Sequence, residues 1–504
     1  MSKILSIKKL VPICSKYKKN KKKIVLCHGV FDILHYGHIL HFEEAKTQGD
    51  ILVVSLTASK YINKGPNRPY YEDPIRLKVL EAISIIDYII LNEDITPINL
   101  INKIKPDIYC KGPDYKKISD DITKNIILEK NAIKKVGGKI YFTNGKTQSS
   151  SNIINSYYKS DDNYLEKAIN HLRKNFNFQE IRNEFEKFLK LKVLVIGETI
   201  IDQYNFCRAI GKSGKEPIMV FKNLEIKKFL GGSAYVARNL TSFCNKIHFL
   251  TLIGDDKKYD LFINKNLEKN IKPFFIKKKN SQTIVKKRYV DDISNSKIIG
   301  VYTYNEVTMK NSEEKKIFSL IKKFKKYDLI LITDFGHGML NQSIINSLKK
   351  KSKYIVANSQ LNAVNKGYQD LKKFKGIDCM TINESELRYE MRDQNIKIEI
   401  LMKKIKQNLG LKKLILTRGK QGVISLNNDN KFYYCGAFSN RVVDKVGSGD
   451  CLMSIVSLFS CMKSNEYLSL VASSLAASDA VQNFGNDKIA NKNKILKSIE
   501  HILK

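Results

Sequence analysis

Short apolar runs alternate with helix-type patterns through residues 24–155. Each run has the length and the β-branched content of a buried strand, and the five runs are IVLCHGVF, ILVVSL, DYIIL, DIYCK and KIYF. The intervening patterns predict helices from Gly37, near 73–85, near 97–103, near 121–135 and from about 149. Such alternation predicts right-handed βαβ units around a parallel sheet.

The strand signals stop at residues 158–190, which are polar, charged and helix-prone. A second α/β pattern begins with KVLVIGETIID at 192–202 and continues to the end of the sequence. We therefore predict one α/β domain at 1–157, a helical connector at 158–190 and a second α/β domain at 191–504. The length of 504 residues is also that of two or three domains.

The net charge of +38 comes almost entirely from lysines that are scattered through every segment. This pattern indicates solvated surfaces rather than a dedicated nucleic-acid site, although it would attract anionic substrates. No apolar run reaches the roughly 18 residues of a membrane span. The 9 cysteines occur singly, which is typical of reduced thiols. We expect a cytoplasmic protein that binds neither membrane nor nucleic acid.

Histidine is concentrated in one place. The chain has 8 histidines, and four of them lie in HGVFDILHYGHILH, residues 28–41. His35 and His38 fall between a predicted strand and a predicted helix, where backbone N–H groups favour phosphate and where Gly29 and Gly37 allow close approach. A zinc site would need a closed set of four ligands, which this spacing does not supply. Histidines that only cap the helix remain an alternative, and phosphate-binding histidines fit best.

The segment GVFDILHYGH, which contains Gly29, Phe31 and Asp32, resembles the signature of the cytidylyltransferase-like nucleotidyltransferases, over about residues 22–157. NKGPNRP (63–69), PDIYCKGPDY (106–115) and TQSSSNII (147–154) are similar to segments of bacterial heptose-1-phosphate adenylyltransferases. An arginine that the glycerol-phosphate relatives carry is absent near Asn144 and Lys146.

This resemblance implies that His35 and His38 are catalytic and flank the α and β phosphates of a nucleotide. By it, Gly29, Phe31 and Asp32 also contribute to nucleotide and phosphate binding, and phosphate is neutralised by Lys64 and Arg76. The nucleotide–sugar pocket is lined by Lys111, Gly112 and Asp114, and a further phosphate is held by Ser149, Ser150 and Ser151. The implied reaction is attack of a sugar phosphate on the α-phosphorus of ATP or CTP, with Mg²⁺ bridging phosphates and pyrophosphate leaving.

A second dense stretch, RVVDKVGSGDCLMSIV, spans residues 441–456. Its glycines precede an apolar helix, so backbone N–H groups can surround developing phosphate charge. Asp450, at the predicted start of that helix, could accept a proton from an attacking hydroxyl. A glycine-rich turn with Asp450 as its N-cap is the alternative.

Five further segments resemble, in order, landmarks of the ribokinase-like (PfkB) sugar kinases, over about residues 191–490: VLVIGETIIDQY (193–204), FLGGSAYVARNL (229–240), LILITDFGHG (329–338), TINESE (381–386) and LILTRGKQGV (414–423). The resemblance implies sugar contacts from Asp202, Gly231, Gly232 and Asn239. It implies ATP, phosphate and indirect Mg²⁺ contacts from Asn383, Glu386 and Arg418, an anion hole at Gly447, Ser448 and Gly449, and Asp450 as the base.

Two departures leave the sugar open. The segment VANSQLNAVNKG (356–367) lacks the D-P-K-like residues of heptose-7-phosphate kinases, and His337 replaces a lysine within DFGHG.

Both activities together resemble the bacterial bifunctional heptose kinase/adenylyltransferases, in which the kinase comes first; here the order is reversed. We therefore expect two tandem α/β domains, a Rossmann-like HxGH nucleotidyltransferase and a ribokinase-like kinase with a mostly parallel sheet. The expected partners are sugar phosphates and nucleoside triphosphates, and a second copy of the chain in a homo-oligomer. Alternatives are a polyol-phosphate cytidylyltransferase fused to a different sugar kinase, an RNA-linked HxGH protein, and a scaffold with a degenerate kinase half.

Overall fold

The computed structural model describes residues 2–62, 68–112, 125–144, 164–304, 309–363, 365, 370–439 and 442–503. The chain divides into two compact units, residues 1–159 together with 496–502 and residues 160–495, and each is described by itself. None of the helices within these ranges is long and apolar enough to cross a membrane.

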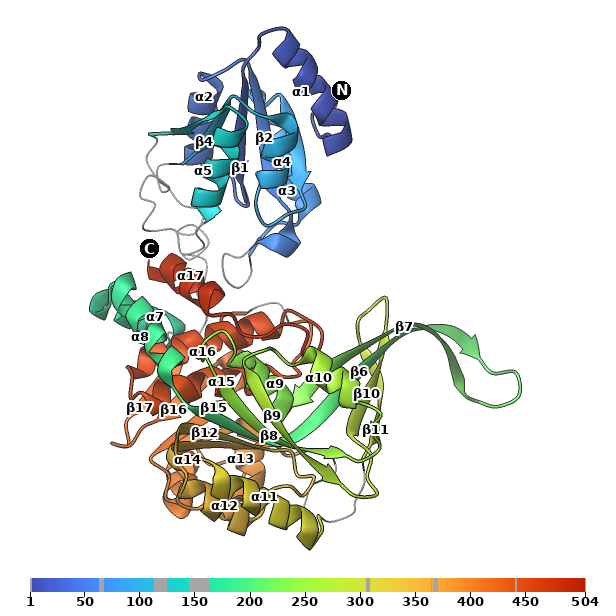
Figure 1. Ribbon diagram of the computed structural model, residues 1–504, viewed down its shortest axis with the longest axis vertical. Coiled ribbons are helices and arrows are strands. Elements are labelled where there is room, and N and C mark those ends of the chain that lie inside the picture. Colours follow the sequence, from blue (N-terminus) through green and yellow to red (C-terminus); the bar gives the residue numbers. More distant parts are fainter. Residues whose placement is uncertain are drawn as a thin grey trace. The chain divides into compact units, whose positions relative to one another are not determined.

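The first unit is a parallel sheet with strand order β3-β2-β1-β4-β5 (Figure 1). Its strands are β1 (Ile24–Gly29), β2 (Ile51–Thr57), β3 (Tyr88–Asn92), β4 (Ile108–Lys111) and β5 (Lys139–Phe142). Its helices are α1 (Ile7–Lys19), α2 (Tyr36–Lys46), α3 (Asp73–Glu81), α4 (Ile98–Ile104) and α5 (Asn125–Lys135). Four predicted helices are therefore present, and the helix predicted from about 149 lies outside the described residues.

Helix α1 precedes the first predicted strand and was not predicted from the sequence. Its Leu10 and Cys14 are nevertheless buried in an apolar cluster on one face of the sheet. A second cluster, with Phe42 of α2 and Leu80 of α3, covers the opposite face.

The second unit is built on parallel strands in the order β9-β8-β6-β12-β13-β14-β15, extended by antiparallel β16 and β17. The strands are β6 (Val193–Lys212), β8 (Ile247–Gly254), β9 (Ile271–Lys278), β12 (Tyr327–Asp334), β13 (Ser352–Ser359), β14 (Cys379–Asn383), β15 (Lys413–Thr417), β16 (Val423–Leu426) and β17 (Phe432–Cys435). The two units confirm the predicted α/β class with mostly parallel sheets.

Helices cover both faces of this sheet (Figure 1). One face carries α11 (Asn311–Lys323), α12 (Gln342–Lys349), α13 (Glu384–Met391) and α14 (Ile398–Leu409), and their apolar side chains share one cluster with β6 and β12. The other face carries α9 (Ser233–Asn239), α15 (Ser448–Cys461) and α16 (Glu466–Ala480). Helix α10 (Asp260–Asn266) lies between β8 and β9 in the chain, and α17 (Lys492–Leu503) ends it.

Strand β6 is long enough to belong to two sheets. Residues 193–198 pair within the parallel sheet, whereas residues 199–212 pair with β7 (Met219–Gly232), and 200–207 also pair with β10 (Ile284–Asp291). Strand β11 (Lys297–Thr303) pairs with β10 at the edge. We call β7, β10, β11 and the second half of β6 the side sheet; its β6–β7 hairpin projects from the body of the unit (Figure 1).

The predicted connector forms two helices that pack on the second unit. In α7 (Tyr164–Asn175) the buried residues Leu165, Ala168 and Leu172 form one stripe, and the Tyr164 ring stacks on Tyr434 at 4.6 Å between centroids. In α8 (Phe178–Lys187) Phe185 packs against Phe459 of α15. The segment is thus part of a core and not a polar spacer.

Candidate active sites

The paired histidines lie where the strand order of the first unit reverses. Strands β1 and β4 are neighbours at the centre of the sheet, and each is followed by a crossover to the opposite side. Ligands of open α/β sheets bind at the carboxyl ends of such a pair. His35 and His38 follow β1, Lys111 ends β4, and α2 begins at Tyr36 with His35 as its N-cap.

Backbone N–H groups fix the orientation of the two imidazole rings. The Gly37 N–H donates to Nδ1 of His35 at 3.2 Å, and the His35 N–H donates to Nδ1 of His38 at 3.4 Å. The ring centroids are 4.0 Å apart. Burial lowers the pKa of His35. With both Nδ1 atoms accepting, a neutral imidazole carries its proton on Nε2, so each ring presents an N–H donor. Helix capping and phosphate binding are therefore compatible in the same residues.

The other two histidines of the cluster are core groups. His28 bonds to Ser55 Oγ at 3.0 Å and Thr57 Oγ1 at 3.3 Å, and His41 bonds to Thr143 Oγ1 at 3.0 Å. Burial, reinforced by the charge of Lys111, lowers the pKa of His28 to about 3, and burial lowers that of His41 to about 4. Both are neutral and are not candidates for the site: His28 links β1 to β2, and His41 links α2 to the residue that follows β5.

Three residues of the segment GVFDILHYGH help to hold the two histidines and the surrounding loop in position. A Cβ on Gly29 would lie 2.9 Å from the Phe31 ring, which packs edge-on against His38 at 5.6 Å between centroids. Asp32 is buried and accepts the N–H groups of Tyr70 at 2.7 Å and Tyr71 at 2.9 Å. These contacts place Gly29, Phe31 and Asp32 in the framework of the site.

The expected cations are paired inside the protein. The guanidinium of Arg76 is buried and donates to the Val30 carbonyl, to Ser59 Oγ and to the Asp73 carboxylate. Lys111 forms a buried ion pair of 2.9 Å with Glu129, and open space surrounds the Cα of Gly112. The structure thus does not leave Arg76 directed at a phosphate. Lys64, Asp114, Ser149, Ser150 and Ser151 lie outside the described residues.

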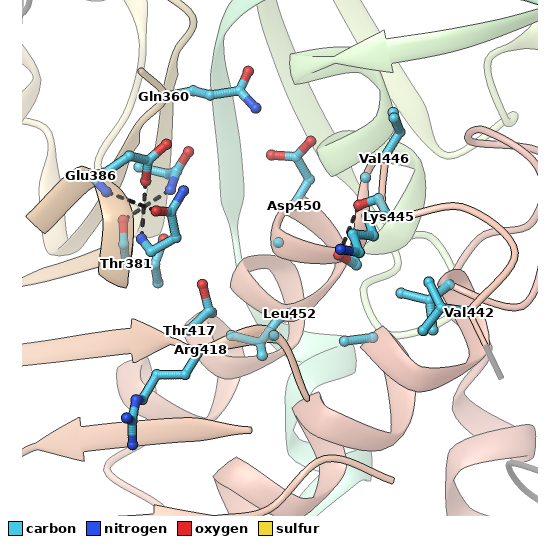
Figure 2. A pocket seen from close by; sticks show the side chains of 18 of the residues that line it. Gln360, Thr381, Glu386, Thr417, Arg418, Val442, Lys445, Val446, Asp450 and Leu452 are labelled. Atoms are coloured by element: carbon cyan, nitrogen blue, oxygen red, sulfur yellow. Dashed lines mark hydrogen bonds between the residues drawn. The ribbon is translucent and has the colours of Figure 1, made fainter. Parts of the chain in front are cut away.

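The second unit contains a pocket of about 950 Å³ at the carboxyl ends of its parallel strands (Figure 2). Nine predicted residues line it: Asp202, Gly232, Asn383, Glu386, Arg418, Gly447, Ser448, Gly449 and Asp450. Gly231 and Asn239 are not among the lining residues. The Asn239 side chain donates to the Tyr235 carbonyl at 3.0 Å and accepts the Ala490 N–H at 2.8 Å, so it fastens the backbone. Gly231 has no room for a Cβ, which would lie 2.0 Å from Asp202 Oδ2.

Helix α15 presents its first turn to this pocket. Gly447 is the N-cap, with a left-handed φ of +80°, and a Cβ there would lie 2.1 Å from Asn486 Oδ1. The N–H groups of a first helical turn have no partners within the helix and can receive an anion. Because the N-cap is Gly447, Asp450 stands in the first turn of the helix and does not cap it.

Asp450 has the electrostatics of a general base. Burial and, to a smaller extent, the carboxylates of Asp202 and Glu386 raise its pKa, Lys286 lowers it, and the net result is a pKa of about 7. A carboxylate that titrates near neutral pH can accept a proton from a hydroxyl and release it again.

Across the pocket, Asn383 and Glu386 form a reciprocal cap at the start of α13. Asn383 Oδ1 accepts the Glu386 N–H at 2.8 Å, and Glu386 accepts the Asn383 N–H at 3.0 Å and the Leu361 N–H at 3.1 Å. Burial raises the pKa of Glu386 to about 7. Arg418 donates to Glu384 at 2.9 Å.

These carboxylates fit the Mg²⁺ that a sugar kinase needs. Asp450 and Glu386 face the same pocket and repel each other, so a divalent cation there would stabilise both charged forms. Glu386 already accepts two backbone N–H groups, which favours contact through water, as Mg²⁺ prefers. Among the described residues no group of three or more His, Cys, Asp or Glu could hold a metal alone. Substrate phosphates would complete the ligand set.

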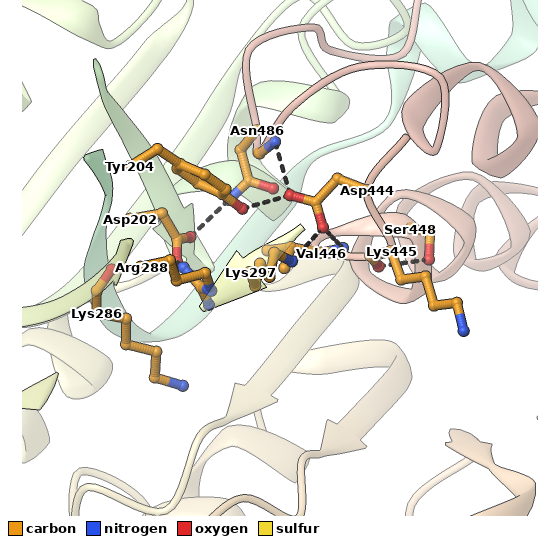
Figure 3. A network of polar contacts seen from close by, with 11 residues as sticks. Asp202, Tyr204, Lys286, Arg288, Lys297, Asp444, Lys445, Val446, Ser448 and Asn486 are labelled. Carbon is orange, nitrogen blue, oxygen red and sulfur yellow. Dashed lines mark hydrogen bonds and ion pairs between the residues drawn. The ribbon is translucent and has the colours of Figure 1, made fainter. Parts of the chain in front are cut away.

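Sequence reasoning missed a polar network beside the pocket (Figure 3). Asp444 accepts from Lys297 at 2.5 Å, Tyr204 at 2.5 Å, Val446 at 3.1 Å and Gly485 at 3.1 Å. These bonds join the turn before α15 to the side sheet.

A second part of the network holds Asp202. Its carboxylate accepts from Arg288 at 2.5 Å and from Asn486 at 2.9 Å. One sequence signal could have indicated this part of the network: the strand pattern TIVKKRYV of β10 contains cationic residues at alternate positions. Lys286 and Arg288, two apart, are on one face of that strand.

Comparisons with known proteins agree with this geometry. Residues 190–468 match a family model described as "pfkB family carbohydrate kinase", and residues 26–156 match one described as "Cytidylyltransferase-like". The "Bifunctional protein HldE" of Campylobacter jejuni (strain RM1221) is 27% identical over 333 residues, which are 62% of this chain and 69% of that protein. The protein of the same name from Campylobacter concisus (strain 13826) is 41% identical over 131 residues, or 25% of this chain and 27% of that protein.

Among solved structures, phosphofructokinase-2 from Escherichia coli in complex with potassium has a TM-score of 0.51 and 12% identity. It covers 62% of this chain and 100% of its own. At that identity the likeness shows the fold of the second unit.

Proposed function

The chain belongs to the pfkB family of carbohydrate kinases, and from this premise we propose that its second unit phosphorylates a heptose-like sugar or sugar phosphate with ATP. The chain is a bifunctional enzyme, because a cytidylyltransferase-like nucleotidyltransferase at 26–156 precedes the kinase at 190–468. The observation that supports the kinase proposal most strongly is Asp450, a carboxylate with a pKa of about 7 beside the first turn of α15.

The kinase residues divide the reaction between them. A sugar hydroxyl held near Asp202 attacks the γ-phosphorus while its proton passes to Asp450, and the bond from phosphorus to the bridging oxygen of ADP breaks. The N–H groups after Gly447 receive the charge that develops on the transferring phosphoryl oxygens. Asn383 and Glu386 would hold Mg²⁺ through water, and the ion would supply screening of the phosphate charges. Arg418 stays near the nucleotide.

In the first unit we propose nucleotidyl transfer to a sugar 1-phosphate. The phosphate oxygen of the sugar attacks the α-phosphorus of ATP or CTP, and pyrophosphate leaves. The Nε2–H groups of His35 and His38 donate to the phosphoryl oxygens as charge builds on them. Positioning supplies most of the remaining rate, so no covalent intermediate is needed.

Both reactions together would make a nucleotide-activated sugar from a sugar phosphate. The relatives named bifunctional protein HldE support one shared route for the two units. We place the nucleotidyltransferase before the kinase in this chain, the reverse of the order in the family that the motifs resemble. The cytoplasm, which supplies nucleoside triphosphates, is the location we propose.

A homo-oligomer is part of the proposal. Large apolar side chains are exposed along the side sheet: Ile210 on β6, Met219, Phe221, Leu224 and Ile226 on β7, Ile218 just before it, and Ile298, Ile299 and Val301 on β11. Exposed apolar surface of this extent favours an interface, and a second copy of the chain is the occupant we propose.

The substrate assignment is tested by incubating the full chain with a panel of sugars and sugar phosphates and each nucleoside triphosphate. Pyrophosphate and ADP are followed separately. We expect ADP with one or a few sugars, and pyrophosphate with a sugar 1-phosphate and one preferred triphosphate. A panel of heptoses and hexoses that yields neither product would contradict the proposed function.

We also expect the two units to function as fragments. Fragment 1–160 should release pyrophosphate, and fragment 160–504 should form ADP, since β1 to β5 of the first sheet lie in the one and β6 to β17 of the second sheet lie in the other. Fragment 188–504 is the control: it lacks α7 and α8, so Phe459 loses its contact with Phe185 and the fragment should melt earlier. Assays of both products, with melting curves, decide the point. Inactive 1–160 and 160–504, or a 188–504 as stable as 160–504, would contradict it.

A further inference from the structure

Lys286 is a buried cation that the proposed reaction has not yet used. It lies in β10 of the side sheet, is 7% exposed and lines the kinase pocket. Strand alternation places Arg288 on the same face and directs Lys287 to the opposite one. Figure 3 shows the Lys286 side chain extended beside Arg288, away from the bonded network around Asp444.

Among the residues that the structure describes, the ammonium of Lys286 forms no hydrogen bond or ion pair. Its neighbours differ, because Arg288 is bonded to Asp202 at 2.5 Å and Lys297 to Asp444 at 2.5 Å. The Lys286 ammonium lies 5.6 Å from the ring centroid of Tyr302 and 5.9 Å from that of Phe335.

The surrounding charges act on Lys286 only through space. Burial lowers its pKa, the carboxylates of Asp202, Asp450 and Glu198 raise it, and Arg288 lowers it. Taking an ammonium out of water without a bonded anion costs several kcal/mol. A lysine with a purely structural role would offset this cost with an ion pair inside the protein. A lysine that binds a ligand gains its anionic partner only when the ligand is present.

We propose that Lys286 forms a phosphoryl-binding subsite at the sugar end of the pocket, between the side sheet and Asp450. The inference rests on the proposed kinase function and deepens it. The ligand atom is a phosphoryl oxygen, since the pocket already holds the negative charges of Asp202 and Asp450 and a further cation suits a doubly charged group. The oxygen belongs either to the γ-phosphoryl group of ATP or to a phosphate already on the acceptor.

Kinetics of full-length Lys286→Met, Lys286→Arg and Lys287→Met test this subsite. With the acceptor found in the panel, we expect Lys286→Met to lower kcat/KM by roughly 10²-fold, since a desolvated charge-assisted contact is lost. Lys286→Arg should recover part of the loss, and Lys287→Met, on the other face of β10, should stay within threefold of the wild type.

The source of the phosphoryl oxygen is read from the acceptor. If the acceptor carries it, the loss appears as a raised KM for the phosphorylated sugar and vanishes with the same sugar lacking phosphate. If ATP carries it, kcat falls with either acceptor. Wild-type kinetics in Lys286→Met with both acceptors would overturn the proposal.

Stability separates this subsite from a structural role. Removing a buried, unpaired charge should leave the melting temperature of Lys286→Met equal to or above that of the wild type, whereas a lysine that holds the side sheet in place would lower it when removed.

Inorganic phosphate supplies a test that needs no sugar. Millimolar phosphate should raise the melting temperature of the wild type and Lys287→Met more than that of Lys286→Met. Equal stabilisation of the three proteins would overturn the inference. If no sugar yields ADP with the wild type, the proposed function fails, and this arm still decides the subsite.

Discussion

Asp450→Asn should reduce sugar-dependent ADP formation by roughly 10²–10⁴-fold while the protein stays folded. A sugar hydroxyl is a poor nucleophile at neutral pH, so its proton must be accepted as the new P–O bond forms. Asparagine preserves the shape of the side chain but cannot accept that proton. Steady-state kcat with saturating ATP and sugar is the measurement, and pyrophosphate release by the first unit is the internal control.

The pH dependence of kcat in the wild type should also identify Asp450 as the base. Because the pKa of Asp450 is raised to about 7, kcat should fall as the pH drops below about 7, where the carboxylate becomes protonated. The small residual rate of Asp450→Asn should lack this acid limb. An acid limb that persists unchanged in the variant would assign the titration to another group.

Stability distinguishes a base from a helix-stabilising residue. A folded-state pKa above the unfolded value means that Asp450 stabilises the fold at low pH, below its ordinary value of about 3.9. That contribution is lost as the pH rises through about 7. At pH 8 Asp450→Asn should therefore melt at the same temperature as the wild type or higher. A clear loss of stability with normal turnover would fit a merely structural Asp450.

His35→Ala and His38→Ala should each lower pyrophosphate release by about 10²–10³-fold, with ADP formation unchanged. Each substitution removes one Nε2–H donor from the carboxyl end of β1. His35→Ala also removes the acceptor for the Gly37 N–H, and loss of an N-cap destabilises a helix by about 1 kcal/mol.

His35→Asn separates the two effects in His35. Asparagine is among the best N-cap residues, so this variant keeps the start of α2 but lacks the imidazole donor. We expect it to melt like the wild type and to be as inactive as His35→Ala. Near-normal nucleotidyl transfer by His35→Asn would leave capping as the only function of this histidine.

Much of this architecture was predictable, because it depends on local patterns. The strands from IVLCHGVF to KIYF and the glycines before α15 carry their signals within a few residues. Helix α1 and the packing of α7 were missed for a different reason. Both segments contain many polar and charged residues, and the apolar stripe of Leu165, Ala168 and Leu172 in α7 can be recognised as a packing face only when the surface that it contacts is known.

The sequence pattern could not show which side chains are bonded to one another in the folded protein. Arg76 and Asn239 stand in the expected motifs, yet Arg76 pairs with Asp73 and Asn239 bonds backbone groups of Tyr235 and Ala490. The importance of Lys286 depends on the register of β10 against β6, which places it beside Asp202. Asn239 with Ala490, and Lys286 with Asp202, are distant in sequence, so these neighbours emerge only from the folded sheet, whereas the pairing of Arg76 with Asp73 is local and depends on the side-chain conformation within α3.

The central claim is that two independent active sites share this chain, and one crossed assay tests it most directly. ADP and pyrophosphate are measured in the same preparations of wild type, Asp450→Asn and His35→Asn. The account predicts that Asp450→Asn loses ADP formation alone and that His35→Asn loses pyrophosphate release alone. Loss of both products in either folded variant, or of neither in both, would contradict it.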